Sequence, residues 1–315
     1  MPITLFVVVP CYNEEEVLSE TTKRLTELFS ELANRNIISN DSRIVYVDDG
    51  SADRTWSLIE EFGKKDCRVR GIKLAHNAGH QNALMAGMMS TMDCYDCVVT
   101  IDADLQDDVN AITQMLEKYS EGCDVVYGVR SKRATDTAFK RVTAQSFYKI
   151  MKMMGVDVVY DHADYRLMSR RAVEALSKYP ERNLFLRGMV PTLGFKTDKV
   201  YYERSERFAG ESKYPLKKML SFAFDGITSF TVKPIKAVTT IGVIACLIAV
   251  VMGIFAIVRQ ISGQTVSGWA SLMCSVWFIG GLQLLGLGLI GEYIGKIFKE
   301  VKRRPLYIIE KDTQK

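Results

Sequence analysis

Short apolar runs alternate with amphipathic segments over the first half of the chain. The apolar runs predict β-strands at 3–9, 43–47, 69–74, 97–101 and 124–127. The segments between them repeat apolar residues with helical spacing, which predicts helices at 15–34, 53–64, 81–92 and 109–120. Strands that alternate with helices are typical of right-handed βαβ units, so we expect an α/β domain with a mainly parallel sheet. Ligands of such sheets bind at the carboxyl ends of the strands.

Two long uncharged stretches dominate the C-terminal region. No charged residue lies between Lys236 and Arg259, a run of 22 residues, and none lies between Arg259 and Glu292, a run of 32. A membrane-spanning helix needs about 20 mostly apolar residues. A pair of buried core helices is the alternative, but core helices rarely run this long without a charge. We therefore predict transmembrane helices at 237–258 and 269–291.

The distribution of charged residues predicts how the chain is oriented in the membrane. The chain has a formal net charge of +4, yet residues 213–315 hold 13 Lys and Arg against 5 Asp and Glu. This basic excess at the membrane end favours contact with anionic lipid headgroups and argues against nucleic acid as a partner. Basic residues flank both predicted spans, whereas the connecting loop at 259–268 carries a single arginine. The positive-inside rule therefore places both termini in the cytoplasm and the loop outside the cell membrane.

These boundaries divide the chain into six segments. The N-terminal sequence MPITLFVVVP lacks the basic region of a signal peptide and reads as a buried strand. The segment that precedes the first span is amphipathic and basic, which suits a helix at the membrane surface, with an ordinary packed helix as the alternative. The predicted segments are a cytosolic domain (1–212), this juxtamembrane segment (213–236), the first span (237–258), an external loop (259–268), the second span (269–291) and a basic cytosolic tail (292–315).

Polar clusters follow three of the predicted strands. Their sequences are PCYNEE at 10–15, DDGSADRT at 48–55 and DADLQ at 102–106. Carboxylates gathered at one edge of a sheet are costly unless a cation or hydrogen-bond donors compensate their charge. Mg²⁺ and Mn²⁺ prefer carboxylate and carbonyl oxygens, and phosphates can complete their coordination. The clusters therefore predict a divalent metal shared with a diphosphate.

The D-x-D sequence in the last cluster is the strongest metal candidate. D-x-D alone is common in surface loops, but this one directly follows an apolar run. We expect Asp104 and Gln106 to face one ion from an extended segment, while Asp102 either shares that ion or binds a ribose. Capping of the next helix by Asp107 and Asp108 is the structural alternative, and it is compatible with a metal site.

Four motifs occur in order along the chain: PCYNEE, VDDGSADRT, HNAGHQNALMAG and IDADLQDD. Together they resemble the GT-A glycosyltransferases of family 2. Three later pieces are similar to the polyisoprenyl-phosphate branch of that family, namely GVR at 128–130, DHADYRLM at 161–168 and RFAGESKY at 207–214. That branch includes dolichyl-phosphate mannose synthases and bactoprenol glycosyltransferases. The resemblance covers essentially the whole chain, and it implies a Rossmann-like GT-A domain with two C-terminal spans.

The resemblance implies a donor site for a nucleotide sugar. Six residues are implied at its nucleotide end: Pro10, Tyr12, Glu14, Asp49, Asn77 and Gly79. The first three line the base pocket, Asp49 reaches the base or the ribose, and the last two form a tight turn at the pocket edge. At the diphosphate, the resemblance implies that Mg²⁺ or Mn²⁺ is held by Asp102, Asp104 and Gln106.

Basic residues are implied at the acceptor phosphate. Arg130 matches the arginine of the family's G-x-R motif. Arg207 and Lys213 match a basic loop that closes over the phosphates. Arg141 either joins this phosphate site or lies in a solvated loop.

Asp164 matches a carboxylate that the family places near the transferred sugar. Three roles remain open for Asp164. It positions a sugar hydroxyl, pairs with Arg166, or acts as a weak base.

A lipid monophosphate acceptor needs little activation. Its second pKa of about 6 leaves it largely dianionic at cytosolic pH. A serine- or histidine-type activation system is therefore unnecessary, and we assign no such role to the three histidines at 76, 80 and 162. A metal on the leaving diphosphate and basic side chains on the acceptor meet the remaining need. Direct attack on the anomeric carbon inverts it, so we expect a β-linked product from an α-linked donor.

We therefore expect transfer of a hexose from a UDP-sugar to undecaprenyl phosphate, with glucose or N-acetylglucosamine ahead of mannose or galactose. A processive polysaccharide synthase is the nearest alternative, but its Q-x-x-R-W element is absent because tryptophan occurs only at 56, 269 and 277. A non-catalytic scaffold of the same fold would not need intact carboxylates, and a lipid-sugar flippase needs more than two membrane helices. Small residues permit close helix approach in a membrane. The second span is therefore compatible with a homo-oligomer through the glycines at 280, 281, 286, 288 and 291.

Overall fold

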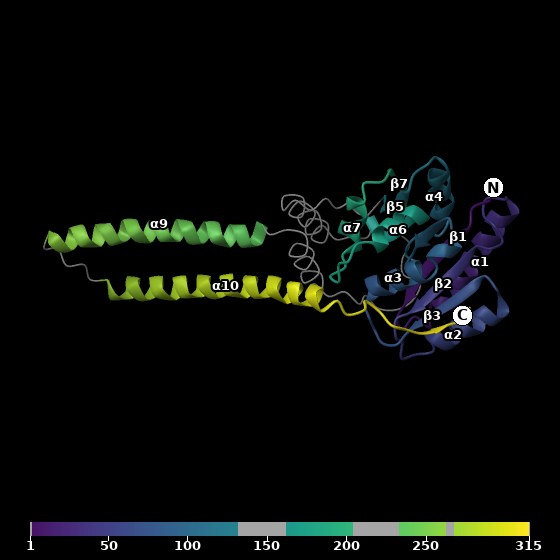
Figure 1. The fold of residues 1–315 in the computed structure, drawn as a ribbon, viewed down its shortest axis with the longest axis horizontal. Helices are drawn as coiled ribbons and strands as arrows, with labels where there is room; N and C mark the ends of the chain where they lie inside the picture. The colour runs from purple at the N-terminus through teal and green to yellow at the C-terminus, as the bar shows by residue number, and fades with distance from the viewer. Residues whose placement is uncertain (1, 132–161, 204–232, 263–267, 315) are drawn as a thin grey trace.

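The chain forms an α/β domain from which two long helices project side by side (Figure 1). The computed structural model describes residues 2–131, 162–203, 233–262 and 268–314. The α/β domain contains both the start and the end of the described chain, so the two helices are an excursion from it.

A single sheet organises the described part of the α/β domain. Its strand order is β7-β5-β6-β4-β1-β2-β3-β8. Strands β1 to β4 pair in parallel, β6 runs antiparallel to β4 and β5, and β8 runs antiparallel to β3. The strands are β1 (Leu5–Cys11), β2 (Arg43–Asp48), β3 (Val69–Leu74), β4 (Cys97–Thr100), β5 (Val125–Arg130), β6 (His162–Ser169), β7 (Thr197–Tyr202) and β8 (Ile309–Asp312).

Helices cover both faces of the sheet. One face packs against α1, α2 and α4, and the other packs against α3, α6 and α7. Side chains alternate between the two cores along β1, with Val7 and Val9 on the first face and Phe6 and Val8 on the second. The helices are α1 (Leu18–Asn34), α2 (Thr55–Lys65), α3 (His80–Ser90), α4 (Ala111–Ser120), α6 (Arg170–Ser177), α7 (Leu186–Thr192), α9 (Lys233–Ile261) and α10 (Trp269–Lys302).

The predicted α/β class and the first four parallel strands are confirmed. The sheet is more mixed than expected, because β6 inserts between β4 and β5. Its sequence HADYRLMS carries charged residues and gave no strand signal. Arg166 in the middle of β6 is nevertheless only 1% exposed, because charged partners accompany it into the domain interior.

The two projecting helices are longer than the predicted spans at 237–258 and 269–291. Both α9 and α10 extend past those limits toward the α/β domain. They contact each other where Val238 lies 3.3 Å from the position that a Cβ would take at Gly286. Within the described residues, one stretch, Phe278–Lys302, is long and apolar enough to cross a membrane by length and composition. This stretch overlaps the predicted span at 269–291, so the predicted span at 237–258 stays a prediction.

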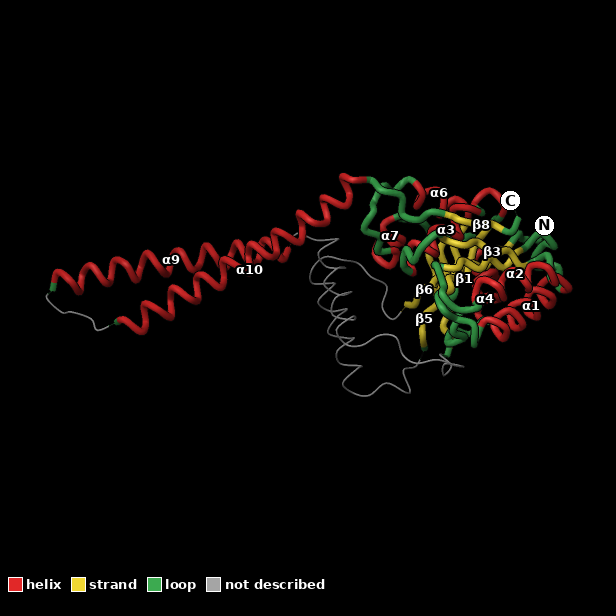
Figure 2. The backbone as a smooth tube through the Cα atoms, turned by 90° about the horizontal axis from the view of Figure 1, so that it is seen from below, coloured by secondary structure: helices red, strands yellow, loops and turns green. Residues whose placement is uncertain are grey.

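The C-terminal segment returns to the sheet, where the sequence predicted only a basic tail at 292–315. Figure 2 shows the chain leaving the end of α10 and entering β8 at the edge of the sheet. Arg70 binds Asp312 through two hydrogen bonds of 3.0 and 2.7 Å, and both side chains are buried. The Gly71 amide donates a hydrogen bond to the Thr313 hydroxyl at 2.9 Å, and the Thr313 amide donates to the Gly71 carbonyl at 3.0 Å. The tail is therefore an integral part of the sheet.

Removing Asp312 tests this attachment. Asp312→Ala leaves the buried guanidinium of Arg70 without its carboxylate, so we expect the free energy of unfolding of the α/β domain to fall by about 3 kcal/mol. Fluorescence of Trp56, which packs beside Gly71, reports the transition during urea denaturation of detergent-purified protein.

Glu310→Gln is the matched control on the same strand. Glu310 pairs with Lys73 at 2.9 Å, but its side chain is 42% exposed. Its loss should cost less than about 1 kcal/mol. Equal effects of the two substitutions would contradict a buried attachment.

Candidate active site

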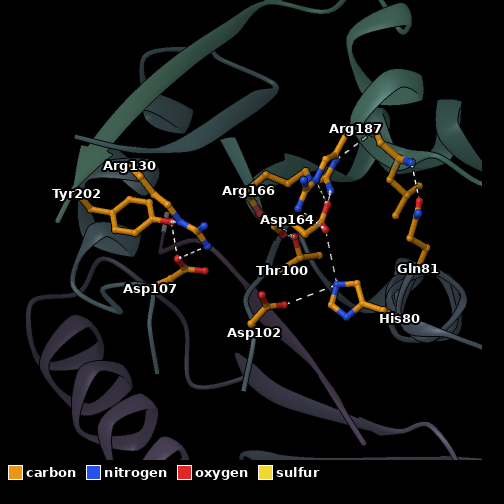
Figure 3. A network of polar contacts seen from close by, with 11 residues as sticks. His80, Gln81, Thr100, Asp102, Asp107, Arg130, Asp164, Arg166, Arg187 and Tyr202 are labelled. Carbon is orange, nitrogen blue, oxygen red and sulfur yellow. Dashed lines mark hydrogen bonds and ion pairs between the residues drawn. The ribbon is translucent and has the colours of Figure 1, made fainter. Parts of the chain in front are cut away.

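Strand β6 brings Asp164 beside the D-x-D sequence. Thr100 at the end of β4 pairs with Arg166 in the antiparallel register, and the Thr100 hydroxyl donates to the Asp164 carbonyl oxygen at 2.6 Å. Asp102 lies two residues after the end of β4. Figure 3 shows Asp102 and Asp164 with their carboxylates turned toward a common space. Two motifs that lie about sixty residues apart in the sequence therefore meet where β4 ends and β6 begins.

Two arginines hold the Asp164 carboxylate. Arg166 donates to Oδ1 at 2.6 Å, and Arg187 of α7 donates to Oδ1 at 3.3 Å and to Oδ2 at 3.1 Å. Burial acts to raise the pKa of Asp164, but the charges of Arg187 and Arg166 outweigh it and hold this pKa far below its usual range. Such a weakly basic carboxylate is a poor proton acceptor. The geometry thus disfavours the weak-base role and contains the predicted pairing with Arg166.

His80 stands between the two carboxylates. Its Nε2 lies 3.6 Å from Asp102 Oδ1 and 3.7 Å from Asp164 Oδ2. Next to it on α3, Gln81 accepts a hydrogen bond from the Leu186 backbone at 2.7 Å, so α3 fixes the start of α7. Sequence reasoning assigned no role to His80 or to Arg187. The signal for His80 was its place directly after Gly79 in the HNAGHQNALMAG motif, whereas Arg187 belongs to no motif.

The D-x-D segment has the chemistry of a divalent-metal site. Desolvation raises the pKa of Asp102 to about 6; the charge of His80 opposes this rise, and nearby carboxylates, including that of Asp104, reinforce it. A bound cation would relieve this concentration of negative charge. Within the described residues, no three His, Cys, Asp or Glu side chains converge as metal ligands. Carboxylate and amide oxygens such as those of Asp102, Asp104 and Gln106 are ligand types that Mg²⁺ and Mn²⁺ accept, and an ion bound there would need further ligands from a substrate.

One premise of the sequence analysis is wrong for this segment. Asp104 and Gln106 do not lie in an extended stretch, because Leu105 between them has a left-handed backbone with φ of 56°. The turn lets the Gln106 amide donate to Asp104 Oδ1 at 3.2 Å. A non-glycine residue in this conformation costs about 1–2 kcal/mol, which is common at functional sites.

At the nucleotide end of the predicted site, hydrogen bonds connect the segments that follow neighbouring strands. Asp49 accepts hydrogen bonds from the Ala78 amide at 2.6 Å and from the Gly79 amide at 3.0 Å. Its carboxylate therefore fixes the predicted turn at Asn77 and Gly79. Of the other predicted residues, the Glu14 amide donates to Thr55, Tyr12 is 43% exposed and Pro10 is buried in β1.

Arg130 lies at the end of β5 in a second cluster. Its guanidinium donates to Asp107 at 3.2 Å and to the Tyr202 hydroxyl at 3.4 Å, and that hydroxyl also donates to Asp107 (Figure 3). Asp107 therefore orients Arg130, and it does not cap α4 as predicted. Asp108 accepts from the Asn110 amide just before α4, but no side chain caps the first turn of α4, so the capping alternative is wrong for both aspartates. The predicted phosphate ligands Arg141, Arg207 and Lys213 lie outside the described residues.

Comparison with known proteins decides the family. The sequence model described as glycosyl transferase family 2 matches residues 6–177, which is more than half of the chain. The chain belongs to glycosyl transferase family 2. The matched residues include β1 to β6 with the Asp102 and Asp164 carboxylates. The protein is therefore a glycosyltransferase with the GT-A fold, as the motif resemblance implied.

Relatives match this glycosyltransferase along its whole length. The uncharacterized glycosyltransferase YkoT of Bacillus subtilis is 56% identical and covers 98% of this chain and 91% of its own. The bactoprenol glucosyl transferase of Shigella phage SfV is 40% identical and covers 98% of this chain and 99% of its own. A solved mannosyltransferase of Pyrobaculum calidifontis, in complex with GDP-Man and Mn²⁺, is 13% identical with a TM-score of 0.47, over 96% of this chain and 88% of that one.

A substitution at Gly50 tests the nucleotide end of the site. Gly50 has φ of 70°, and a Cβ there would lie 2.7 Å from the Asn77 backbone nitrogen. Gly50→Ala must therefore displace the turn that Asp49 holds, at a cost of about 1–2 kcal/mol for the backbone conformation alone. We expect the KM for the nucleotide sugar to rise about tenfold.

Gly194→Ala is the control for backbone strain. Gly194 has φ of 71°, with no atom within 4 Å of its Cβ position, and it lies between α7 and β7. This variant should lose stability and keep the KM for the donor. A matching rise in KM would mean that the Gly50 effect is not local.

Proposed function

We propose that this glycosyltransferase moves a hexose from a UDP-sugar to a polyisoprenyl phosphate, such as undecaprenyl phosphate, at the cytosolic face of the cell membrane. The observation that carries the proposal is the attachment of a family 2 carboxylate site to a pair of exposed apolar helices. The 40% identity to a bactoprenol glucosyl transferase over nearly the full chain supports the same acceptor. Glucose is the first candidate sugar, followed by N-acetylglucosamine.

The donor phosphates would lie against the D-x-D segment. Asp102, Asp104 and Gln106 would hold Mg²⁺ or Mn²⁺, which would neutralise charge on the leaving diphosphate. Asp49 keeps the 78–79 turn in place for the nucleotide. Asp164 remains ionised between its arginines, and we assign it to a hydroxyl of the transferred sugar.

The acceptor phosphate would meet Arg130. Asp107 and Tyr202 fix this guanidinium at the end of β5, and a preset cation needs no reorganisation when the phosphate arrives. Arg141, Arg207 and Lys213 are proposed as further phosphate ligands. The lipid phosphate attacks the anomeric carbon as a dianion, the diphosphate leaves, and the anomeric configuration inverts.

The helices α9 and α10 are proposed as two membrane spans. Their outer side chains include large apolar residues that the described chain leaves exposed, among them Val251 at 65% and Leu284 at 70%. Exposed apolar surface of this extent needs a lipid or protein environment. Gly280, Gly281 and Gly288 leave open space on α10 for close approach of another copy, so a homo-oligomer is part of the proposal.

A donor screen tests the reaction. Purified protein receives undecaprenyl phosphate, Mg²⁺ or Mn²⁺ and each labelled nucleotide sugar, and label in the lipid fraction is measured. We expect label from UDP-glucose or UDP-N-acetylglucosamine, and a loss of about a hundredfold or more in Asp104→Asn because that residue would hold the metal.

Asp108→Asn is the matched control in the same motif, since the Asp108 side chain accepts hydrogen bonds from Asn110 just before α4. It should retain transfer. Full transfer by Asp104→Asn would overturn the metal assignment. Absence of labelled lipid with every donor would overturn the proposed reaction.

Cysteine labelling tests the two-span topology. Ser262 lies at the far end of α9, while the native Cys67 and Cys94 are exposed on the α/β domain. An impermeant maleimide added to intact cells should label Ser262→Cys strongly, and it should react with Cys67 and Cys94 only after lysis. Protection of position 262 in intact cells would contradict an external loop.

A further inference from the structure

The end of α10 binds the α/β domain through one carboxylate. Both Glu300 side-chain oxygens lie 2.9 Å from the Arg182 amide, and Oε1 also accepts from the Asn183 amide at 2.8 Å. The Asn183 side chain donates back to Glu300 at 3.0 Å and to the Lys296 carbonyl at 3.3 Å. Residues 182–183 are thus fastened to the last turns of the long helix.

The fastened residues lead directly to the catalytic carboxylate. Asn183 and Arg187 are four positions apart, and Arg187 donates to both oxygens of Asp164. Between them, the Leu186 amide donates to Gln81 and the Leu186 carbonyl accepts from Arg166 at 3.3 Å. The segment 182–187 therefore has α10 at one end and the active site at the other.

Little else fastens the start of this segment. Among the described residues, the Glu181 Oε2 and Arg182 Nε atoms are buried without a hydrogen-bond partner. These two atoms do not secure the start of the segment, and the bonds to Glu300 hold the backbone of residues 182–183, whereas Leu186 and Arg187 further along are held by the domain itself. Hydrogen bonds to a charged acceptor are about twice as strong as neutral ones, so one carboxylate can fix both amides.

We propose that Glu300 is a positioning residue, which seats the membrane helix α10 against segment 182–187 and thereby fixes Arg187 on Asp164. This inference deepens the proposed function, on which its catalytic part rests. An acceptor that reaches the site from the bilayer would then meet a sugar-binding carboxylate whose position is set by the membrane helix itself. A displaced α10 would release Arg187 before it affected the D-x-D segment, which follows β4.

A double-mutant cycle tests the proposal with Glu300→Ala, Arg187→Lys and the double variant. Each is assayed with the lipid acceptor for kcat, for the donor KM and for the melting temperature. We expect Glu300→Ala to lower kcat about tenfold with the donor KM unchanged, because it removes charge-assisted bonds rather than donor contacts. Since Glu300 acts through Arg187, the double variant should be no slower than Arg187→Lys alone.

Glu310→Gln is the matched control. Glu310 is also a C-terminal carboxylate that binds the α/β domain, but it pairs with Lys73 on β3. It should retain kcat and show additive behaviour with Arg187→Lys. Multiplicative effects of Glu300→Ala and Arg187→Lys, or a loss of kcat explained by a lower melting temperature, would reduce Glu300 to a fold-stabilising contact and overturn the proposal.

Hydrogen exchange separates this inference from the proposed reaction. Peptides that cover 182–192 should exchange about tenfold faster in Glu300→Ala than in the wild type, with peptides of β4 unchanged, because only the segment near α10 is released. Unchanged exchange at 182–192 would overturn the positioning role whatever the substrate. In another outcome, the wild-type enzyme transfers no sugar to lipid while Glu300→Ala still shows the faster exchange. That result would overturn the proposed reaction and retain the attachment of α10 to segment 182–187.

Discussion

A buried pairing of carboxylate with guanidinium underlies the architecture of the site. Asp164 and Arg166 lie two positions apart on β6, and both side chains are largely buried in the domain. Neither charge could be buried alone, since an unpaired ion inside a protein costs several kcal/mol or more. Arg187 adds a second positive charge, so the cluster includes α7 as well as β6. The position of β6 between β4 and β5 is thus tied to the charges that it carries.

The carboxylates at this sheet edge fall into two groups with different compensation. Two arginines bind both oxygens of Asp164, whereas Arg130 and Tyr202 bind one oxygen of Asp107, and its other oxygen is buried without a hydrogen-bond partner among the described residues. Asp102 has only His80 within ion-pair distance among the described residues, and its pKa is raised first by desolvation and then by the nearby carboxylates. The protein's own cations therefore compensate the carboxylate on β6, whereas they leave the carboxylate after β4 less compensated.

The sequence predicted those strands and strand ends that depend only on neighbouring residues in the chain. Uniform apolar runs identified β1 to β4, and the polar clusters after them identified Asp49, Asp102 and Asp104, because strand ends follow directly from the sequence. The antiparallel β6 and β8 were missed since charged residues interrupt both, and their burial depends on partners far away in the chain, such as Arg70 for Asp312. His80 and Arg187 were missed for the same reason, because tertiary contacts alone give them their partners.

Strand β8 is the last element of the described chain to be synthesised, although it pairs with β3, one of the first. Synthesis runs from the N-terminus, so Ile309–Asp312 is made only after both long helices exist. Until then β3 has an open edge, and unpaired sheet edges invite wrong pairing with other chains. The last strand of the described sheet can be added only once α9 and α10 have been made and the chain has returned to the α/β domain. Completion of the sheet therefore waits for synthesis of both long helices.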